Sequence, residues 1–81
     1  MSEAEIKAAV YKILRKIAPE ADLDQVRPEE NLREALDIDS FDFLNFMIAL
    51  HEQLNVEIPE SDYRKLTSLS ELTRYLSVRL K

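Results

Sequence analysis

The sequence has 81 residues, a formal net charge of -5 and no cysteine. A chain of this length has room for one domain with one core, and its 46% of apolar residues is typical of a folded protein. Disulfides and thiolate metal ligands are excluded, and the single histidine, His51, cannot form a zinc site. We therefore expect one metal-free domain, residues 1–81, stabilised by helix packing.

Negative charge is concentrated in the middle of the chain. Residues 20–42 contain nine acids against Arg27 and Arg33. Such a surface disfavours nucleic acid and anionic membranes and favours basic partners, although a solvated loop has the same composition. No apolar run approaches the roughly 20 residues that cross a bilayer, and no signal-peptide pattern is seen. We expect no membrane insertion and a cytoplasmic location, or an organelle after removal of a transit segment.

The first predicted helix lies between Ser2 and Pro19. Ser2 is a suitable N-cap, acids follow it, and basic residues occupy the last turns, where the helix dipole favours cations. Pro19 ends the helix. Four apolar residues recur at helical spacing: Ile6, Val10, Ile13 and Ile17.

Residues 18–39 have no regular period, and we predict a long loop there that contains one or two helical turns. Pro28 can start a short turn that runs to Leu36. Because so long a connection is unusual without anchors, we expect four apolar side chains to hold it to the core. These are Leu23, Val26, Leu32 and Leu36.

The second long helix, predicted at 40–54, has two apolar faces. Five residues form the face toward the core: Phe43, Phe46, Met47, Leu50 and Leu54. Phe41, Leu44 and Ile48 fall on the opposite side. Either the 18–39 loop covers them, or they form an exposed apolar patch that binds a partner. We favour the patch, because a polar loop cannot easily cover all three.

The remaining elements are shorter. The chain has no glycine, so Asn55 is the candidate for ending helix 40–54 in left-handed geometry, and an extended segment, 56–58, follows. A short helix is expected at 60–66, with Tyr63 and Leu66 facing inward. Ser68 and Glu71 form a capping box for a last helix. Its apolar stripe consists of Leu69, Leu72, Leu76 and Leu80. The expected fold is all-α, a four-helix bundle with a long loop between helices 1 and 2 and a short helix 3.

Ser40 follows Asp39 at the start of helix 40–54, and either residue can be the N-cap. A hydroxyl at this position, beside the apolar patch, is expected to be exposed. A phosphate esterified to it would be favoured by the free amides of the first turn. No base lies nearby, since His51 is three turns away, so we expect another enzyme to modify Ser40. No nucleophile–base constellation is present, and we expect no catalytic activity.

The whole chain resembles the acyl carrier protein family. The family motif Asp-Ser-Leu at the start of helix 2 is matched by Asp39, Ser40 and Phe41, with phenylalanine for the usual leucine. The matching stretches are Leu36-Asp37-Ile38-Asp39-Ser40-Phe41-Asp42, Ala49-Leu50-His51-Glu52 and Val56-Glu57-Ile58-Pro59, with Leu32-Arg33-Glu34-Ala35-Leu36 and Lys65-Leu66-Thr67-Ser68-Leu69 around them.

This resemblance implies a carrier whose Ser40 bears 4'-phosphopantetheine, transferred from coenzyme A by a phosphopantetheinyl transferase. The thiol of the arm would hold acyl groups as thioesters, with the acyl chain between the helices. Acyl-transferring or acyl-synthesising enzymes with basic patches would dock on helix 2, and we expect the carrier to be a monomer. The implied docking residues are Asp39, Phe41, Asp42, Leu44, Ile48 and Glu52.

Some residues depart from the family pattern. Asp37 replaces a glycine before the serine, although Asp tolerates left-handed geometry better than most residues. Asn45 and His51 replace acids of helix 2, and Phe43 and Phe46 add bulk near the expected acyl cavity. We therefore favour a specialised carrier over the housekeeping carrier of fatty acid synthesis.

Two alternatives remain. The first is a peptidyl or aminoacyl carrier of a nonribosomal pathway, but that family more often has His before the serine, so Asp39 favours the acyl carrier. The second is an unmodified helical adaptor that binds a basic partner through helix 40–54. His51 is interpreted as a surface histidine. Three tyrosines are interpreted as packing residues with solvated hydroxyls: Tyr11, Tyr63 and Tyr75.

Overall fold

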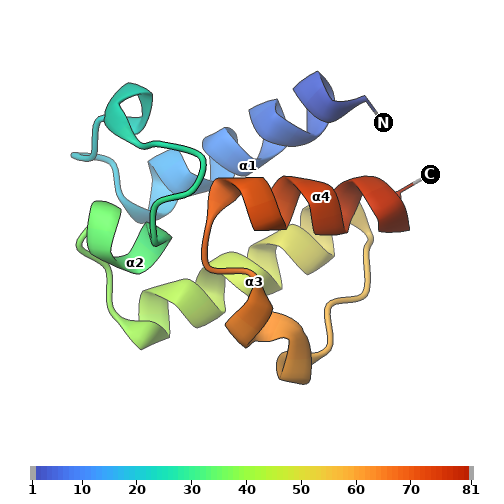
Figure 1. Ribbon diagram of the computed structural model, residues 1–81. Coiled ribbons are helices and arrows are strands. Elements are labelled where there is room, and N and C mark those ends of the chain that lie inside the picture. The colour runs from blue at the N-terminus through green and yellow to red at the C-terminus, as the bar shows by residue number, and fades with distance from the viewer. Residues whose placement is uncertain (1, 81) are drawn as a thin grey trace.

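The computed structural model describes residues 2–80, so both ends of the expected domain 1–81 lie outside the described residues. Every regular element in the described part is helical (Figure 1). The elements in chain order are α1 (Glu3–Ile17), η1 (Leu23–Gln25), α2 (Leu32–Ala35), α3 (Ser40–Leu54), η2 (Glu60–Lys65) and α4 (Leu69–Arg79). The helix α1 packs against both α3 and α4. The expected all-α bundle is confirmed.

Ser2 is the N-cap of α1, as the sequence predicts, and the structure adds a reciprocal capping box with Glu5. The Ser2 hydroxyl accepts a hydrogen bond from the Glu5 N–H at 3.2 Å, and the Glu5 carboxylate accepts one from the Ser2 N–H at 3.0 Å. These bonds satisfy amides that the helix itself leaves free, and they lower the pKa of Glu5. The helix ends where the Ala18 N–H bonds the Leu14 carbonyl, just before Pro19.

The connection from α1 to α3 is a long loop held to the core, as expected. Leu23, Leu32 and Leu36 are buried, and Val26 is half-buried. Two backbone bonds also tie the loop to the start of α4: the Leu32 N–H donates to the Thr67 carbonyl at 2.7 Å, and the Ser70 N–H donates to the Pro28 carbonyl at 2.9 Å. These anchors explain how so long a connection keeps one conformation.

One expectation for this loop is wrong. Pro28 starts a tight turn, but the turn closes at Glu30, whose N–H bonds the Arg27 carbonyl at 3.1 Å. The turn does not continue to Leu36. A separate helix, α2, begins beyond it because the Asn31 side chain accepts from the Glu34 N–H at 3.2 Å and provides a new N-cap.

The hydrophobic core contains the expected inner face of α3. Phe46, Met47 and Leu50 are fully buried, Phe43 is nearly so, and Leu54 is half-buried. The rings of Phe43 and Phe46 meet edge to face, with centroids 6.3 Å apart. The other helices contribute Ile6, Val10, Ile13 and Leu14 from α1 and Leu69, Leu72 and Leu76 from α4. Leu80, which follows α4, is half-buried.

Beyond α3 the chain turns sharply. Asn55 has φ 51° and ends α3 in left-handed geometry, as expected. The residues 60–65 form a 3-10 helix rather than an α-helix, and no residue within η2 is buried. Leu66, which follows it, is buried, and Tyr63 is half-buried. The element ends at Lys65 because Leu66 leaves helical geometry, with ψ 48°, while its N–H bonds the Tyr63 carbonyl.

Ser68 is the N-cap of α4, and its hydroxyl accepts from the Glu71 N–H at 3.2 Å. The Glu71 carboxylate in turn accepts from the hydroxyls of Ser68 and Thr67. Among the described helices, none has the length and apolar character that spanning a bilayer requires.

Candidate functional site

The first turn of α3 presents Ser40 to solvent. Asp39 is the N-cap of this helix: its Oδ1 accepts from the Asp42 N–H at 2.8 Å, and its backbone is extended. Ser40 is therefore the first residue of the helix rather than its cap, which the sequence left open. Its side chain is exposed. The hydroxyl is accessible to another molecule and is not consumed by the capping bond.

The turn before Ser40 has the geometry of a Schellman motif. The Ile38 N–H donates to the Arg33 carbonyl at 3.0 Å, and the Asp37 N–H donates to the Glu34 carbonyl at 3.4 Å. Asp37 has φ 53°, the left-handed geometry that usually selects glycine at this position. The expectation that Asp37 forms this turn without glycine is confirmed. The motif ends α2 and directs the chain into α3, so it sets where Ser40 lies.

The helix start suits an anion at Ser40. By helix geometry the amides of Ser40 and Phe41 have no partner within α3, and they lie at the positive end of its dipole. Asp39 and Asp42 oppose this effect, because their carboxylates lie in the same turn. A phosphodiester at Ser40 thus meets free N–H donors and remains open to water, which screens the nearby carboxylates.

An open depression of about 490 Å³ lies beside this turn. One side is formed by the end of α1 and the residues after it, and the other by residues 35–38 together with Asp42. Its carboxylates come from Glu20, Asp22, Asp37 and Asp42. Within the described residues, no group of histidines and acids is arranged to hold a metal ion.

The second apolar face of α3 is exposed. Phe41 is 68% exposed, Leu44 38% and Ile48 43%, so the 18–39 loop does not cover them. We call these three residues the exposed stripe. At about 100° per residue, Ser40, Leu44, Ile48 and His51 fall within about 80° of one another around α3. The exposed stripe therefore runs from beside Ser40 toward the opposite end of the helix.

A second open hollow, of about 290 Å³, lies at that opposite end. We call it the α3–η2 groove. Ile48 and His51 of α3 form one wall, and the other wall consists of Glu57, Ile58, Pro59 and Tyr63. Ile48 lies about 12 Å along the helix axis from Ser40, because eight residues separate them at about 1.5 Å each. The groove therefore lies at the far end of the exposed stripe from Ser40.

The remaining expected docking residues are Asp39, Asp42 and Glu52. At about 100° per residue Glu52 falls beside the exposed stripe, whereas Asp42 falls on another side of α3 and lines the depression beside the end of α1. Asp39 and Glu52 are exposed, and Asp42 is half-buried. Asn45, which replaces an acid of the family pattern, is also exposed. The acids of this face are therefore near the two ends of α3, and its middle is apolar or neutral.

Two contacts near the groove were missed from the sequence. His51, expected to be a plain surface residue, is exposed but bonds the Val56 carbonyl through Nδ1 at 2.8 Å. The expectation that the Tyr75 hydroxyl is solvated is wrong, because this hydroxyl donates a hydrogen bond to Asp62 Oδ2 at 2.6 Å. Burial and this bond to Asp62 raise the pKa of Tyr75 to about 12. The hydrogen bond from Tyr75 is the main cause that lowers the pKa of Asp62.

Comparison with known proteins agrees with this arrangement. Residues 8–76 match the family model described as the phosphopantetheine attachment site. The chain is 34% identical to the acyl carrier protein of Campylobacter lari over 71 residues, which cover 84% of this chain and 92% of that protein. It is 31% identical to the acyl carrier protein of Chlorobium phaeobacteroides over 77 residues, 94% of this chain and 96% of the relative. With the acyl carrier protein of Campylobacter fetus the identity is 38% over 72 residues, 89% and 87% of the two chains.

The protein is thus a phosphopantetheine-binding domain with a helical fold. More narrowly, the chain belongs to the acyl carrier protein family. Members of this family are carriers rather than enzymes, and they hold 4'-phosphopantetheine covalently. A phosphopantetheinyl transferase modifies them, and they interact with enzymes that handle acyl groups. The exposed hydroxyl at the start of α3 fits this cofactor, because it offers an attachment oxygen beside free amides.

Proposed function

We propose that Ser40 is the attachment point of 4'-phosphopantetheine and that the protein, as one carrier domain, holds acyl intermediates as thioesters on the thiol of the arm. The observation that carries the proposal is the division of roles at the start of α3: Asp39 makes the capping bond, and the neighbouring Ser40 keeps an exposed hydroxyl. In the transfer, the Ser40 oxygen forms a bond to phosphorus, its proton is lost, and the nucleotide part of coenzyme A leaves.

The exposed stripe is the proposed docking surface for the transferase and for acyl-handling enzymes. Its apolar side chains supply the contact area, since Phe41, Leu44 and Ile48 remain 68%, 38% and 43% exposed in the isolated chain and can bury that surface in a complex. Asp39, Asp42 and Glu52 supply negative charge around it, which suits partners with basic patches. This surface lies directly beside Ser40, so a docked enzyme reaches the attachment point.

The α3–η2 groove is the proposed shelter for the acyl chain. It lies at the end of the exposed stripe, and Ile48, Ile58, Pro59 and Tyr63 give it apolar walls. A chain placed there leaves water without entering the core, in which Phe43 and Phe46 already occupy the centre.

We further propose a specialised role. Asn45 in the middle of the docking surface and His51 near its far end lack the negative charge that is common in the family at these positions. Partners of this carrier therefore depend more on the apolar contact and less on long-range attraction. We expect such a carrier to work as a monomer in the cytoplasm.

Intact-mass measurement after incubation with coenzyme A, magnesium and a broad-specificity phosphopantetheinyl transferase tests the attachment. We expect the wild type to gain one arm and Ser40→Ala to gain none. Ser61→Ala, which removes an exposed serine of η2, is the matched control and keeps the gain. An unmodified wild type would leave only the adaptor function, and a modified Ser40→Ala would place the arm elsewhere.

A further inference from the structure

The position of η2 depends on unusually few apolar contacts. No residue within η2 is buried, and the buried residues nearest to it are Ile58 before it and Leu66 after it. Tyr63 is half-buried and lines the α3–η2 groove. The groove wall is therefore a short segment with buried residues only at its two ends, and between them Tyr63 packs against the core while only partly buried. Polar contacts can add to this limited apolar support.

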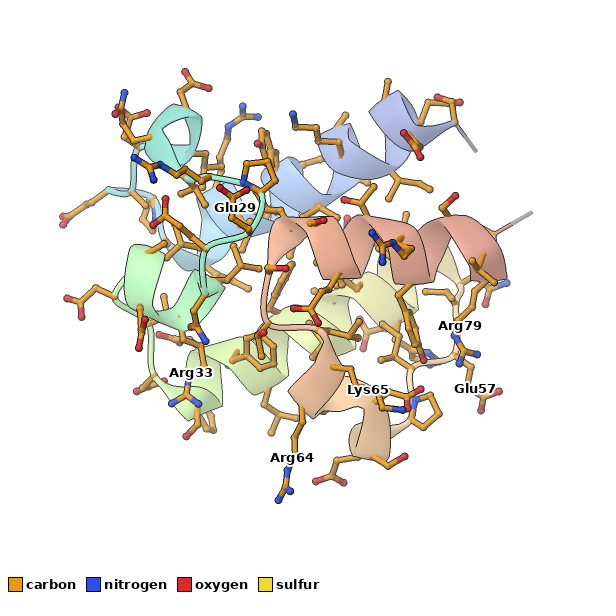
Figure 2. The ribbon with its side chains drawn as sticks, in the orientation of Figure 1. Glu29, Arg33, Glu57, Arg64, Lys65 and Arg79 are labelled. Carbon is orange, nitrogen blue, oxygen red and sulfur yellow. The ribbon has the colours of Figure 1, made fainter. Side chains whose placement is uncertain are left out.

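Asp62 provides this support through a group of polar contacts to α4. Its Oδ2 accepts a hydrogen bond from the Tyr75 hydroxyl at 2.6 Å and lies 3.4 Å from Arg79 Nη2. Its Oδ1 lies 3.7 Å from Lys65 Nζ. The guanidinium of Arg79 also lies over the Tyr75 ring, 4.2 Å from its centroid. We call Asp62, Lys65, Tyr75 and Arg79 the Asp62 cluster; Figure 2 shows Lys65 on η2 and Arg79 near the end of α4.

The contacts within this cluster differ in strength. The Asp62 side chain is only 18% exposed, and its bond to Tyr75 is short and charge-assisted, so that bond is the strongest. The Lys65 side chain is 74% exposed, and its Nζ lies as far as 3.7 Å from Asp62 Oδ1. This ion pair is therefore weak. The Asp62–Tyr75 bond joins residues 13 positions apart and crosses from η2 to α4. It therefore fixes one element relative to the other.

The two walls of the groove are held in different ways. The α3 wall is rigid, because Met47 and Leu50 of the same helix are fully buried in the core. The start of the other wall is tied to α3 by the bond between His51 and the Val56 carbonyl. Its far side carries Tyr63, which directly follows Asp62. A change in the position of Asp62 therefore moves Tyr63 relative to Ile48 and changes the width of the groove.

We propose that Asp62 is a positioning residue: through Tyr75 and Arg79 it holds η2 against α4 and keeps the α3–η2 groove at the width that shelters the cargo carried on Ser40. This inference rests on the proposed function, since it presupposes an arm on Ser40 and a cargo in the groove. The polar partners of Asp62 among the described residues are Lys65, Tyr75 and Arg79, and none of them belongs to the exposed stripe, so we expect Asp62 to act through η2.

The test compares long and short cargo on the same carrier. Wild type, Asp62→Asn and Tyr75→Phe are loaded with an octanoyl or an acetyl arm by a broad-specificity transferase and the matching acyl-coenzyme A. Cleavage of each thioester by hydroxylamine is then followed by intact mass. Glu60→Gln is the matched control, because Glu60 is an exposed acid of the same η2 turn outside the Asp62 cluster.

We expect the wild type to cleave octanoyl more slowly than acetyl. Asp62→Asn keeps an oxygen that can accept from Tyr75 but loses the negative charge, so this protection falls by roughly fivefold, the order of change that the difference between a charged and a neutral hydrogen bond produces in an equilibrium. Acetyl cleavage stays unchanged, because a two-carbon group does not reach the groove. Tyr75→Phe gives the same direction of change while it keeps the aromatic ring beneath Arg79, and Glu60→Gln behaves as wild type.

The outcomes separate this inference from the proposed function. If the wild type accepts no arm, the proposed function fails. If loading is normal but octanoyl and acetyl are cleaved equally in the wild type, the inference fails and the attachment at Ser40 stands. The same conclusion follows if Asp62→Asn and Tyr75→Phe protect octanoyl as well as Glu60→Gln does. Circular dichroism of each loaded variant shows whether it is folded, and should Asp62→Asn unfold, the result for Tyr75→Phe decides.

Discussion

Phe41 and Phe46 lie on the same helix, and the structure predicts opposite consequences for their removal. Phe46 is fully buried, whereas Phe41 is 68% exposed. Complete burial of a phenylalanine contributes about 1.5–3 kcal/mol, so the buried third of Phe41 contributes about 0.5–1 kcal/mol. Phe41→Ala should therefore lower the free energy of unfolding by less than about 1 kcal/mol. Phe46→Ala leaves a cavity as well and should cost about 3–5 kcal/mol, a large part of the stability of so small a domain.

Urea denaturation followed by circular dichroism measures both values. The same proteins are then offered to a phosphopantetheinyl transferase, and kcat/KM for the modification is determined. We expect Phe41→Ala to remain folded and to lose kcat/KM, because Phe41 is mostly exposed and belongs to the proposed docking surface. A loss of stability above about 2 kcal/mol in Phe41→Ala would show that the side chain packs within the chain. Unchanged kcat/KM would show that the exposed stripe does not bind the transferase.

Two further predictions concern backbone geometry and pH. Asn55→Ala should lower the free energy of unfolding, measured by urea denaturation, by about 1 kcal/mol, because an alanine Cβ disfavours left-handed geometry and offers no polar group in return. Asn55→Gly should change it by only about a few tenths of a kcal/mol, since glycine accepts this geometry. Equal losses in the two variants would show that the left-handed geometry is not the cause. Burial is the larger cause and the hydrogen bond to Asp62 the smaller cause that raise the pKa of Tyr75 from 10.0 to about 12. The contribution of the neutral Tyr75 hydroxyl to folding stability is therefore complete below pH 10 and is lost as the pH rises through about 12. The fall in melting temperature between pH 10 and about pH 12 should be smaller in Tyr75→Phe than in the wild type. Equal falls in these two proteins would show that ionisation of Tyr75 is not the cause.

The local features of the fold follow from the sequence because they depend on neighbouring residues. Ser2 with Glu5 specifies the start of α1 through contacts three residues apart. The two apolar faces of α3 follow from a period of 3.6 residues, and the exposure of Ile48 agrees with that period. The left-handed end of α3 at Asn55 can be predicted because the chain has no glycine, which leaves few residue types that accept this geometry.

Other features depend on contacts that no local pattern contains. The bond between Asp62 and Tyr75 joins residues 13 apart on different elements, so nothing in either segment indicates it. The end of the turn at Pro28 is set by Asn31, which caps a new helix before Leu36; an asparagine three residues before Glu34 is a usable sequence signal for such a cap. For Ser40, exposure and the position in the helix were predictable, but the choice between Asp39 and Ser40 as the cap required the coordinates.

The division of labour between Asp39 and Ser40 has a consequence for how the carrier cycles. The bond that starts α3 is made by one residue, and the oxygen that would be esterified belongs to the next. With the arm on Ser40 as proposed, gain, exchange and loss of cargo would leave the capping bond of α3 in place, and the unloaded and loaded forms would share the same helix start. Successive enzymes would meet one constant scaffold and would have to tell the forms apart by the arm and its load.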